Sequence, residues 1–361
     1  MSNTNPATLA LARLRQQAKI LLSAARAADP AVLERLLKVP RLAELPMAAL
    51  PAAVQLADCQ HVIARQVGAE SWPLLKQQLE DLDPRVIPAE QVLMFLAQRD
   101  FNRVRLLLSQ NPELGPVNLF AAAATADIEA VEWFLAAGPP SPRHPRNQWT
   151  PLLYLAGSPL HADSPGASQR FLEVARRLLD AGADPNEHTR WSDDEEKSRL
   201  SALYRAVIGN NVPLVGLLLE RGADPNDGES IYHGAEMNHR ECLELLRAHG
   251  ANISEPDPHW GNTPLHFLAG LSEGHPGTET SALGMAWLLE HGADPNVPSG
   301  DAKETPLHHL VRNRRADGVL TLLLDHGADP NARRADGHTP CQLAVRAGHT
   351  GALELLRARG A

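Results

Sequence analysis

One five-residue string recurs along the second half of the chain and constrains its fold more than any other feature. GADPN occurs four times, starting at Gly182, Gly222, Gly292 and Gly327, and a decayed copy, GANIS, starts at Gly250. Repeated strings of this kind indicate a small supersecondary unit that is stacked many times, because one copy cannot bury its own apolar face.

A second motif begins with Thr or Ser and stands upstream of each copy. Its six occurrences are TPLL at Thr150, SALY at Ser201, SIYH at Ser230, TPLH at Thr263, TPLH at Thr305 and TPCQ at Thr339. From Thr339 to Gly360 the spacing is 21 residues, and from Ser201 to Gly222 it is again 21. Each motif is followed by a helical pattern, so the spacing predicts a pair of short helices.

The chemistry of one unit follows from its residues. Thr305 can cap the first helix, and Pro306 suits the first helical position, where its missing N–H costs nothing. The leucines within 320–324 give the second helix an apolar face. Gly327 can end that helix in a left-handed conformation, and residues 329–331 (DPN) then open the next hairpin.

These motifs resemble ankyrin repeats, whose signature is T-P-L-H-x-A in a period of about 33 residues. The resemblance covers about 88–361 and predicts an all-α fold: an ankyrin-repeat solenoid of about eight helix-turn-helix repeats with a helical N-terminal capping region. We expect the capping region at 1–85 and the ankyrin repeat domain at 86–361. The resemblance also implies that His308 hydrogen-bonds around its turn.

Three insertions interrupt the repeat. Residues 157–170 and 270–280 lengthen the connection between the two helices of a unit, and Gly, Pro and Ser in them predict exposed loops. Residues 187–200 lengthen a hairpin and carry the acidic run Asp193–Glu196, usually a solvated loop but also suited to a basic partner patch.

The N-terminal 85 residues read as amphipathic helices. Residues 9–37 form two helices broken at Asp29, and residues 56–79 form two more around Gly68, the second capped by Ser71. The SWPxLK pattern at 71–76 is similar to an N-terminal segment of many bacterial ankyrin proteins. A helix-turn-helix that reads DNA is the alternative, but Lys76 is a thin basis for phosphate contact, so we expect a cap.

Composition weighs against other classes of function. The chain has 34 Lys and Arg against 43 Asp and Glu, a net charge of −9, whereas nucleic-acid binding needs a basic face. Cys59, Cys242 and Cys341 lie far apart, which fits a reducing compartment. With no long apolar run and no secretory signal, we expect a cytoplasmic protein that contacts neither membrane nor nucleic acid.

The sequence gives no sign of catalysis. Sixteen histidines suggest a metal site, but eight of them recur in repeat slots and none clusters with cysteine at ligand spacing. Phosphate-binding glycine loops and a nucleophile elbow are missing from the sequence. We therefore expect no cofactor, no metal and no enzymatic activity.

The remaining surface is the one that ankyrin proteins use, the hairpin tips and the exposed face of each first helix. Because Trp and Arg carry much of the energy of protein interfaces, we expect partner contacts there, although Trp before a TP motif often packs instead. The expected partner-binding residues are Arg146, Trp149, Trp191, His259, Trp260, Glu304, Arg312 and Arg346.

The resulting hypothesis is a monomeric, non-catalytic protein–protein interaction module, a scaffold or adaptor. The alternatives are an inhibitor or immunity-type protein that occludes an enzyme or toxin, and a secreted effector directed at a host.

Overall fold

The computed structural model divides the chain into two compact units, Met1–Val117 and Asn118–Ala361. In this division the first expected repeat groups with the N-terminal helices, and the expected boundary after residue 85 stays a prediction. The described residues are 6–66, 70–81, 86–111, 114, 117–139, 141–190, 199–254, 256–257, 261–271 and 278–361.

The regular elements among the described residues of the first unit are all helices, joined by turns and short loops. Its elements are α1 (Pro6–Arg26), α2 (Pro30–Leu36), the 3-10 turn η1 (Met47–Ala49), α3 (Leu50–Ala53), α4 (Leu56–Gln66), α5 (Trp72–Asp81), α6 (Val86–Ala97) and α7 (Phe101–Gln110). The predicted break at Asp29 is confirmed, because this carboxylate accepts from the backbone N–H of Ala31 at 3.0 Å and caps α2. Ser71 caps α5 more weakly, at 3.4 Å from the N–H of Leu74.

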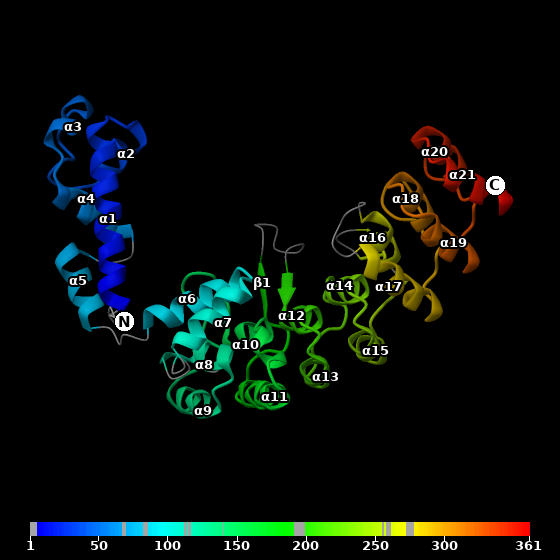
Figure 1. The fold of residues 1–361 in the computed structure, drawn as a ribbon, viewed down its shortest axis with the longest axis horizontal. Coiled ribbons are helices and arrows are strands. Elements are labelled where there is room, and N and C mark those ends of the chain that lie inside the picture. The colour runs from blue at the N-terminus through cyan, green and yellow to red at the C-terminus, as the bar shows by residue number, and fades with distance from the viewer. Residues whose placement is uncertain are drawn as a thin grey trace. The chain divides into compact units, whose positions relative to one another are not determined.

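The second unit consists of helix pairs in chain order (Figure 1). The pairs are α8 (Leu119–Thr125) with α9 (Ile128–Ala137), α10 (Pro151–Ala156) with α11 (Pro165–Asp180), α12 (Ala202–Ile208) with α13 (Val212–Glu220), α14 (Ser230–Glu236) with α15 (Arg240–Ala248), α16 (Pro264–Gly270) with α17 (Thr278–Glu290), α18 (Pro306–Arg312) with α19 (Asp317–Asp325), and α20 (Pro340–Ala347) with α21 (Thr350–Ala358). Together with α6 and α7, the described residues contain the eight repeat pairs that the spacing predicts.

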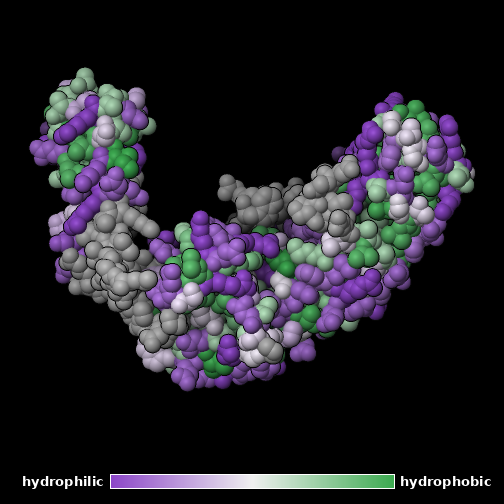
Figure 2. Space-filling view, viewed as in Figure 1, coloured by the Kyte–Doolittle hydropathy of each residue, from purple (hydrophilic) through white to green (hydrophobic). Residues whose placement is uncertain are grey.

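Packing within the second unit runs from repeat to repeat. The first helices of successive pairs, α8 to α20, contact one another in one row, and most second helices do so in another (Figure 1). Fully buried leucines fill the space between the rows, among them Leu153, Leu218 and Leu268. Figure 2 shows that hydrophilic residues cover much of the visible surface around this apolar interior.

The insertions fold more than the sequence suggests. Residues 157–170 are not an exposed loop: they contain the turn η3 (Pro159–Ala162) and the start of α11. His161 is buried there, and its ring nitrogens lie 2.8 Å from the carbonyl oxygen of Ser158 and 3.1 Å from that of Gly209. A histidine that bridges two repeats holds this insertion against the stack.

The inserted hairpin supplies the strands β1 (His188–Arg190) and β2 (Arg199–Ser201), which pair antiparallel with His188 opposite Ser201. The acidic run Asp193–Glu196 lies outside the described residues, as do most of the residues of the insertion at 270–280.

Candidate functional site

Two first helices begin with a threonine–histidine pair that ties one repeat to the next. In α16, Nδ1 of His266 lies 2.7 Å from the hydroxyl of Thr263, and its Nε2 lies 2.9 Å from the carbonyl oxygen of Glu304 in the following hairpin. His308 makes the same two kinds of contact one repeat later, which confirms the role expected of it. Burial lowers the pKa of His266 to about 4, so the ring is neutral near pH 7 and serves as a structural bridge.

In two other repeats a carboxylate, rather than a histidine, makes the connection to the neighbouring repeat. Where leucine or tyrosine holds the fourth motif position, the residue after GADPN is acidic: Glu187 accepts from the hydroxyl of Thr150, and Asp227 accepts from that of Ser201. Burial raises the pKa of Glu187 to about 7, and burial likewise raises that of Asp227. A histidine in the first helix of one repeat and a carboxylate in the hairpin of the next repeat are thus interchangeable ways to connect the two repeats.

The GADPN asparagines form a third set of connections. The Asn186 side chain donates to the carbonyl oxygen of Gly222 at 3.0 Å and accepts from the N–H of Asp224 at 2.8 Å. Asn226 and Asn296 make equivalent contacts with the next repeat. The asparagine of the repeated string therefore satisfies backbone groups of its neighbour.

Strongly shifted pKa values often mark active sites. Here those of His266, Glu187 and Asp227 arise from burial at joints between repeats. Within the described ranges, His, Cys, Asp and Glu side chains form no group of three that could hold a metal ion. In the same ranges the helices lack an apolar stretch of the length that a bilayer requires.

Glu304, expected at the partner surface, is buried and ion-paired. Its side chain is 4% exposed and lies 2.8 Å from Arg312, 2.8 Å from Arg334 and 3.2 Å from Nε2 of His309. Burial, followed by the charge of Arg312, lowers the pKa of His309 to about 4. This corrects the expectation for Glu304: its carboxylate is enclosed by the stack and instead positions Arg312.

Trp149 is also an internal residue. Its exposed fraction is 7%, and the guanidinium carbon of Arg205 lies 3.7 Å from the centre of its ring. The ring of Tyr154 packs beside it, with centroids 5.1 Å apart. The expectation that Trp149 offers its ring to a partner is therefore corrected, because a cation–π stack with Arg205 of the next repeat already occupies the ring.

The remaining expected residues divide into two groups. Arg146, Arg312 and Arg346 are exposed, the last two at the same position at the end of a first helix. Trp191, His259 and Trp260 lie outside the described residues. Among the described residues, the exposed members of the expected partner surface are thus all arginines, on a hairpin and at the ends of first helices.

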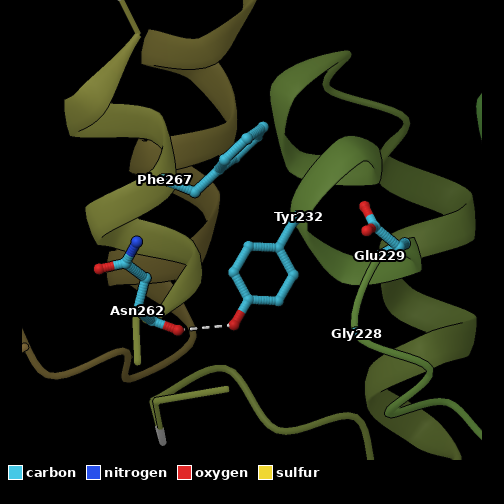
Figure 3. Close-up of a pocket in the computed structure, with 5 residues that line it drawn as sticks. All are labelled: Gly228, Glu229, Tyr232, Asn262 and Phe267. Atoms are coloured by element: carbon cyan, nitrogen blue, oxygen red, sulfur yellow. Dashed lines mark hydrogen bonds between the residues drawn. The ribbon is translucent and has the colours of Figure 1, made fainter. Parts of the chain in front are cut away.

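A pocket that the sequence did not indicate lies between α14 and α16 (Figure 3). It measures about 250 Å³ and is lined by Gly228, Glu229, Tyr232, Asn262 and Phe267. Tyr232 donates its hydroxyl proton to the carbonyl oxygen of Asn262 at 2.7 Å, which fixes the ring in the pocket wall. The SIYH motif that carries Tyr232 reads only as a degenerate repeat start, so nothing in its spacing signals a pocket.

The stacked helix pairs, their hairpins and their asparagine and histidine connections define a repeat solenoid. The family model for ankyrin repeats (three copies) matches residues 166–257, 235–334 and 283–361. The chain therefore belongs to the ankyrin repeat family, whose members generally mediate protein–protein interaction.

Similar proteins carry the same repeats in larger chains. Ankyrin repeat and SOCS box protein 14 of mouse is 34% identical over 143 residues, which are 38% of this chain and 22% of that protein. Ankyrin repeat and SOCS box protein 6 of human is 30% identical over 155 residues, 40% of this chain and 36% of that one. The chain thus spans only about a fifth to a third of these relatives.

Among solved structures, the ankyrin repeat domain of human ASB11 is 26% identical, with a TM-score of 0.48. The match covers 66% of this chain and 96% of that domain.

Proposed function

We propose that this protein is a non-catalytic scaffold or adaptor that binds another protein through its hairpin tips and first helices. The observation that carries the proposal is how the polar groups are distributed. Histidines, carboxylates and asparagines at the joints are occupied in holding repeats together, whereas Arg146, Arg312 and Arg346 extend to the surface. A rigid scaffold that presents arginines binds at low conformational cost.

The buried Glu304 supports the role of Arg312. The Arg312 side chain is 52% exposed, yet one of its terminal nitrogens is held 2.8 Å from a Glu304 oxygen. A long side chain that is fixed before binding loses less rotamer freedom on contact with a partner. Arg312 is therefore preorganised for an interface.

The test compares two triple variants as baits in a pull-down from lysate of the native cell. The first replaces Arg146, Arg312 and Arg346 with Ala and should lose a partner that the unmodified protein retains. The matched control replaces three exposed arginines of second helices, Arg240, Arg247 and Arg357, and should retain it. Equal retention by both variants, with unchanged melting, would remove the arginines from the interface.

We further propose a monomeric protein of a reducing compartment such as the cytoplasm, with no nucleic-acid partner. The free thiols of Cys59, Cys242 and Cys341 are compatible with that location. An inhibitor of an enzyme or toxin, or a secreted effector, would bind through the same surface. The identity of the captured partner and its stoichiometry separate these possibilities. The expectation that 1–85 acts as a cap, with its bacterial-type SWPxLK segment, stays a prediction.

A further inference from the structure

The negative charge of the chain is concentrated in one segment. Residues 222–302 contain 13 Asp and Glu but only 2 Lys and Arg, a net charge of −11, whereas the whole chain carries −9. The rest of the chain therefore sums to +2. The two basic residues of the segment, Arg240 and Arg247, are both on the second helix α15. The hairpins and first helices of this segment thus contain acidic residues and neither lysine nor arginine.

The pocket between α14 and α16 lies within this segment. Its walls are largely apolar, because Tyr232 and Phe267 line it with their rings, whose centroids are 5.8 Å apart at an interplanar angle of 79° (Figure 3). The Tyr232 hydroxyl already donates to a backbone oxygen, so the ring rather than the hydroxyl is available to an occupant. Aromatic rings attract cations through the negative potential of their faces.

One carboxylate lines the pocket and a second lies next to its lining. Glu229 lines it directly. The Asp257 carboxylate lies beside Gly228, since a Cβ built on this glycine would be 3.3 Å from an Asp257 oxygen. Gly228 has a φ of +82°, a left-handed conformation that glycine adopts without strain, and its missing side chain leaves room for the Asp257 carboxylate.

Neighbouring groups hold the Glu229 carboxylate in place. His233 lies between two carboxylates, with Nε2 3.2 Å from Glu229 and Nδ1 2.7 Å from Glu236. Burial by itself lowers the pKa of His233, but the hydrogen bonds to both glutamates outweigh it, and the net shift is upward. Even with His233 protonated, this trio keeps one negative charge, and Asp257 adds another.

We propose that this pocket binds an arginine or lysine side chain of the partner protein, which rests on the binding function proposed above. The stem of such a side chain packs against the rings of Tyr232 and Phe267, and its cationic end reaches Glu229 and Asp257. Charge-assisted hydrogen bonds and cation–π contacts are both strengthened where the site is partly desolvated. The net −11 of the surrounding segment steers a basic partner toward the pocket.

The three tyrosines of the chain provide a direct test. With 3-fluorotyrosine incorporated, fluorine NMR follows Tyr232 in the pocket and Tyr204 on the adjacent first helix, while the fully buried Tyr154 serves as the internal control. The probe is a hexa-arginine peptide, compared with a hexa-citrulline peptide at constant ionic strength. We expect a saturable shift of the Tyr232 resonance with arginine, none with citrulline, and a constant Tyr154 resonance.

Two charge-matched variants distinguish the pocket from general attraction. Glu229→Gln should weaken the affinity for hexa-arginine about fivefold or more, the effect of losing one charge-assisted contact. Glu241→Gln removes the same charge from the exposed surface of α15 and should weaken it less than about twofold. Phe267→Leu keeps an apolar side chain without its ring and should also weaken binding, with melting as the check on folding.

Two results would overturn the proposal: a Tyr232 resonance that does not respond to hexa-arginine, or equal losses in the Glu229 and Glu241 variants. Neither result would contradict the proposal that the chain binds a partner protein, because the Arg146, Arg312 and Arg346 variants test that proposal separately.

Discussion

Substituting alanine for Gly284 tests how closely the repeats are packed. Gly284 lies inside α17, which contacts α14 of the preceding repeat. A Cβ added at Gly284 would lie 1.8 Å from the backbone oxygen of Ala235 and 2.6 Å from its carbonyl carbon. Real Cβ atoms essentially never approach within 3.0 Å, so the two helices would have to separate by more than 1 Å.

The magnitude follows from what surrounds the contact. The obstructing atoms belong to a helix backbone and cannot rotate away as a side chain would. Overpacking of a dense core costs about 1–3 kcal/mol, and a gap of 0.5–1 Å along the rest of the interface forfeits a quarter to a half of its dispersion energy. We expect Gly284→Ala to lower the free energy of unfolding by about 3 kcal/mol or more.

Gly216 in α13 is the matched control. The nearest atom to a Cβ there is a terminal carbon of Leu245 at 3.9 Å, an ordinary contact. Since glycine inside a helix is worse than alanine by about 0.5–1 kcal/mol, Gly216→Ala should stabilise the protein by about that amount. Urea unfolding, followed by far-ultraviolet circular dichroism, measures the free energy of unfolding of both variants. A loss below about 1 kcal/mol for Gly284→Ala would refute the close approach of α14 and α17.

Three further predictions concern the joints between repeats. Glu187 has a pKa of about 7 when folded, above its ordinary 4.5, so the stability that it contributes is fully present below pH 4.5 and is lost as the pH rises from 4.5 to about 7. Glu187→Gln should therefore remove up to about 3 kcal/mol of destabilisation at pH 8, measured by urea unfolding against pH, whereas the exposed Glu220→Gln should change nothing. The double variant Leu153→His with Glu187→Val exchanges the carboxylate joint for a histidine joint. Its loss in free energy of unfolding should be smaller than the sum of the losses of the two single variants by about 1 kcal/mol. Strictly additive losses would contradict the idea that the two joints are interchangeable. Trp149→Ala should cost about 3–5 kcal/mol because it removes a buried ring from the cation–π stack, and a melting temperature within 2 °C or so of the parent would contradict its burial.

Much of the local structure could be predicted from the sequence because it depends on nearby residues. The helix break at Asp29, the cap at Thr305, the helix starts at the TP motifs and the eight helix pairs follow from short-range spacing. Insertions were harder to predict. Gly, Pro and Ser in 157–170 indicated an exposed loop, but His161 bonds to a carbonyl 48 residues away. A contact at that separation leaves no periodic signal in the chain.

The candidate site was predicted only in part, for the same reason. Repeat position predicts that Arg312 and Arg346 are exposed at the ends of first helices, and both are exposed, whereas their contact with a partner stays a prediction. Repeat position does not reveal that the Glu304 carboxylate is enclosed, because the burial of Glu304 depends on Arg334 of the next hairpin. The residue types alone do not distinguish a surface charge from a buried ion pair.

The sequence by itself determined the class of fold, since caps, glycine turns and apolar helix faces recur at fixed spacing and each acts within about one repeat. Only the tertiary structure decided which polar residues face inward. Whether a joint is closed by His266 or by Glu187, and whether Tyr232 and Phe267 enclose a pocket, depends on side chains that meet across two stacked repeats. Such contacts join residues about 30–40 positions apart, and the repeat pattern specifies the positions without specifying what fills the space between them.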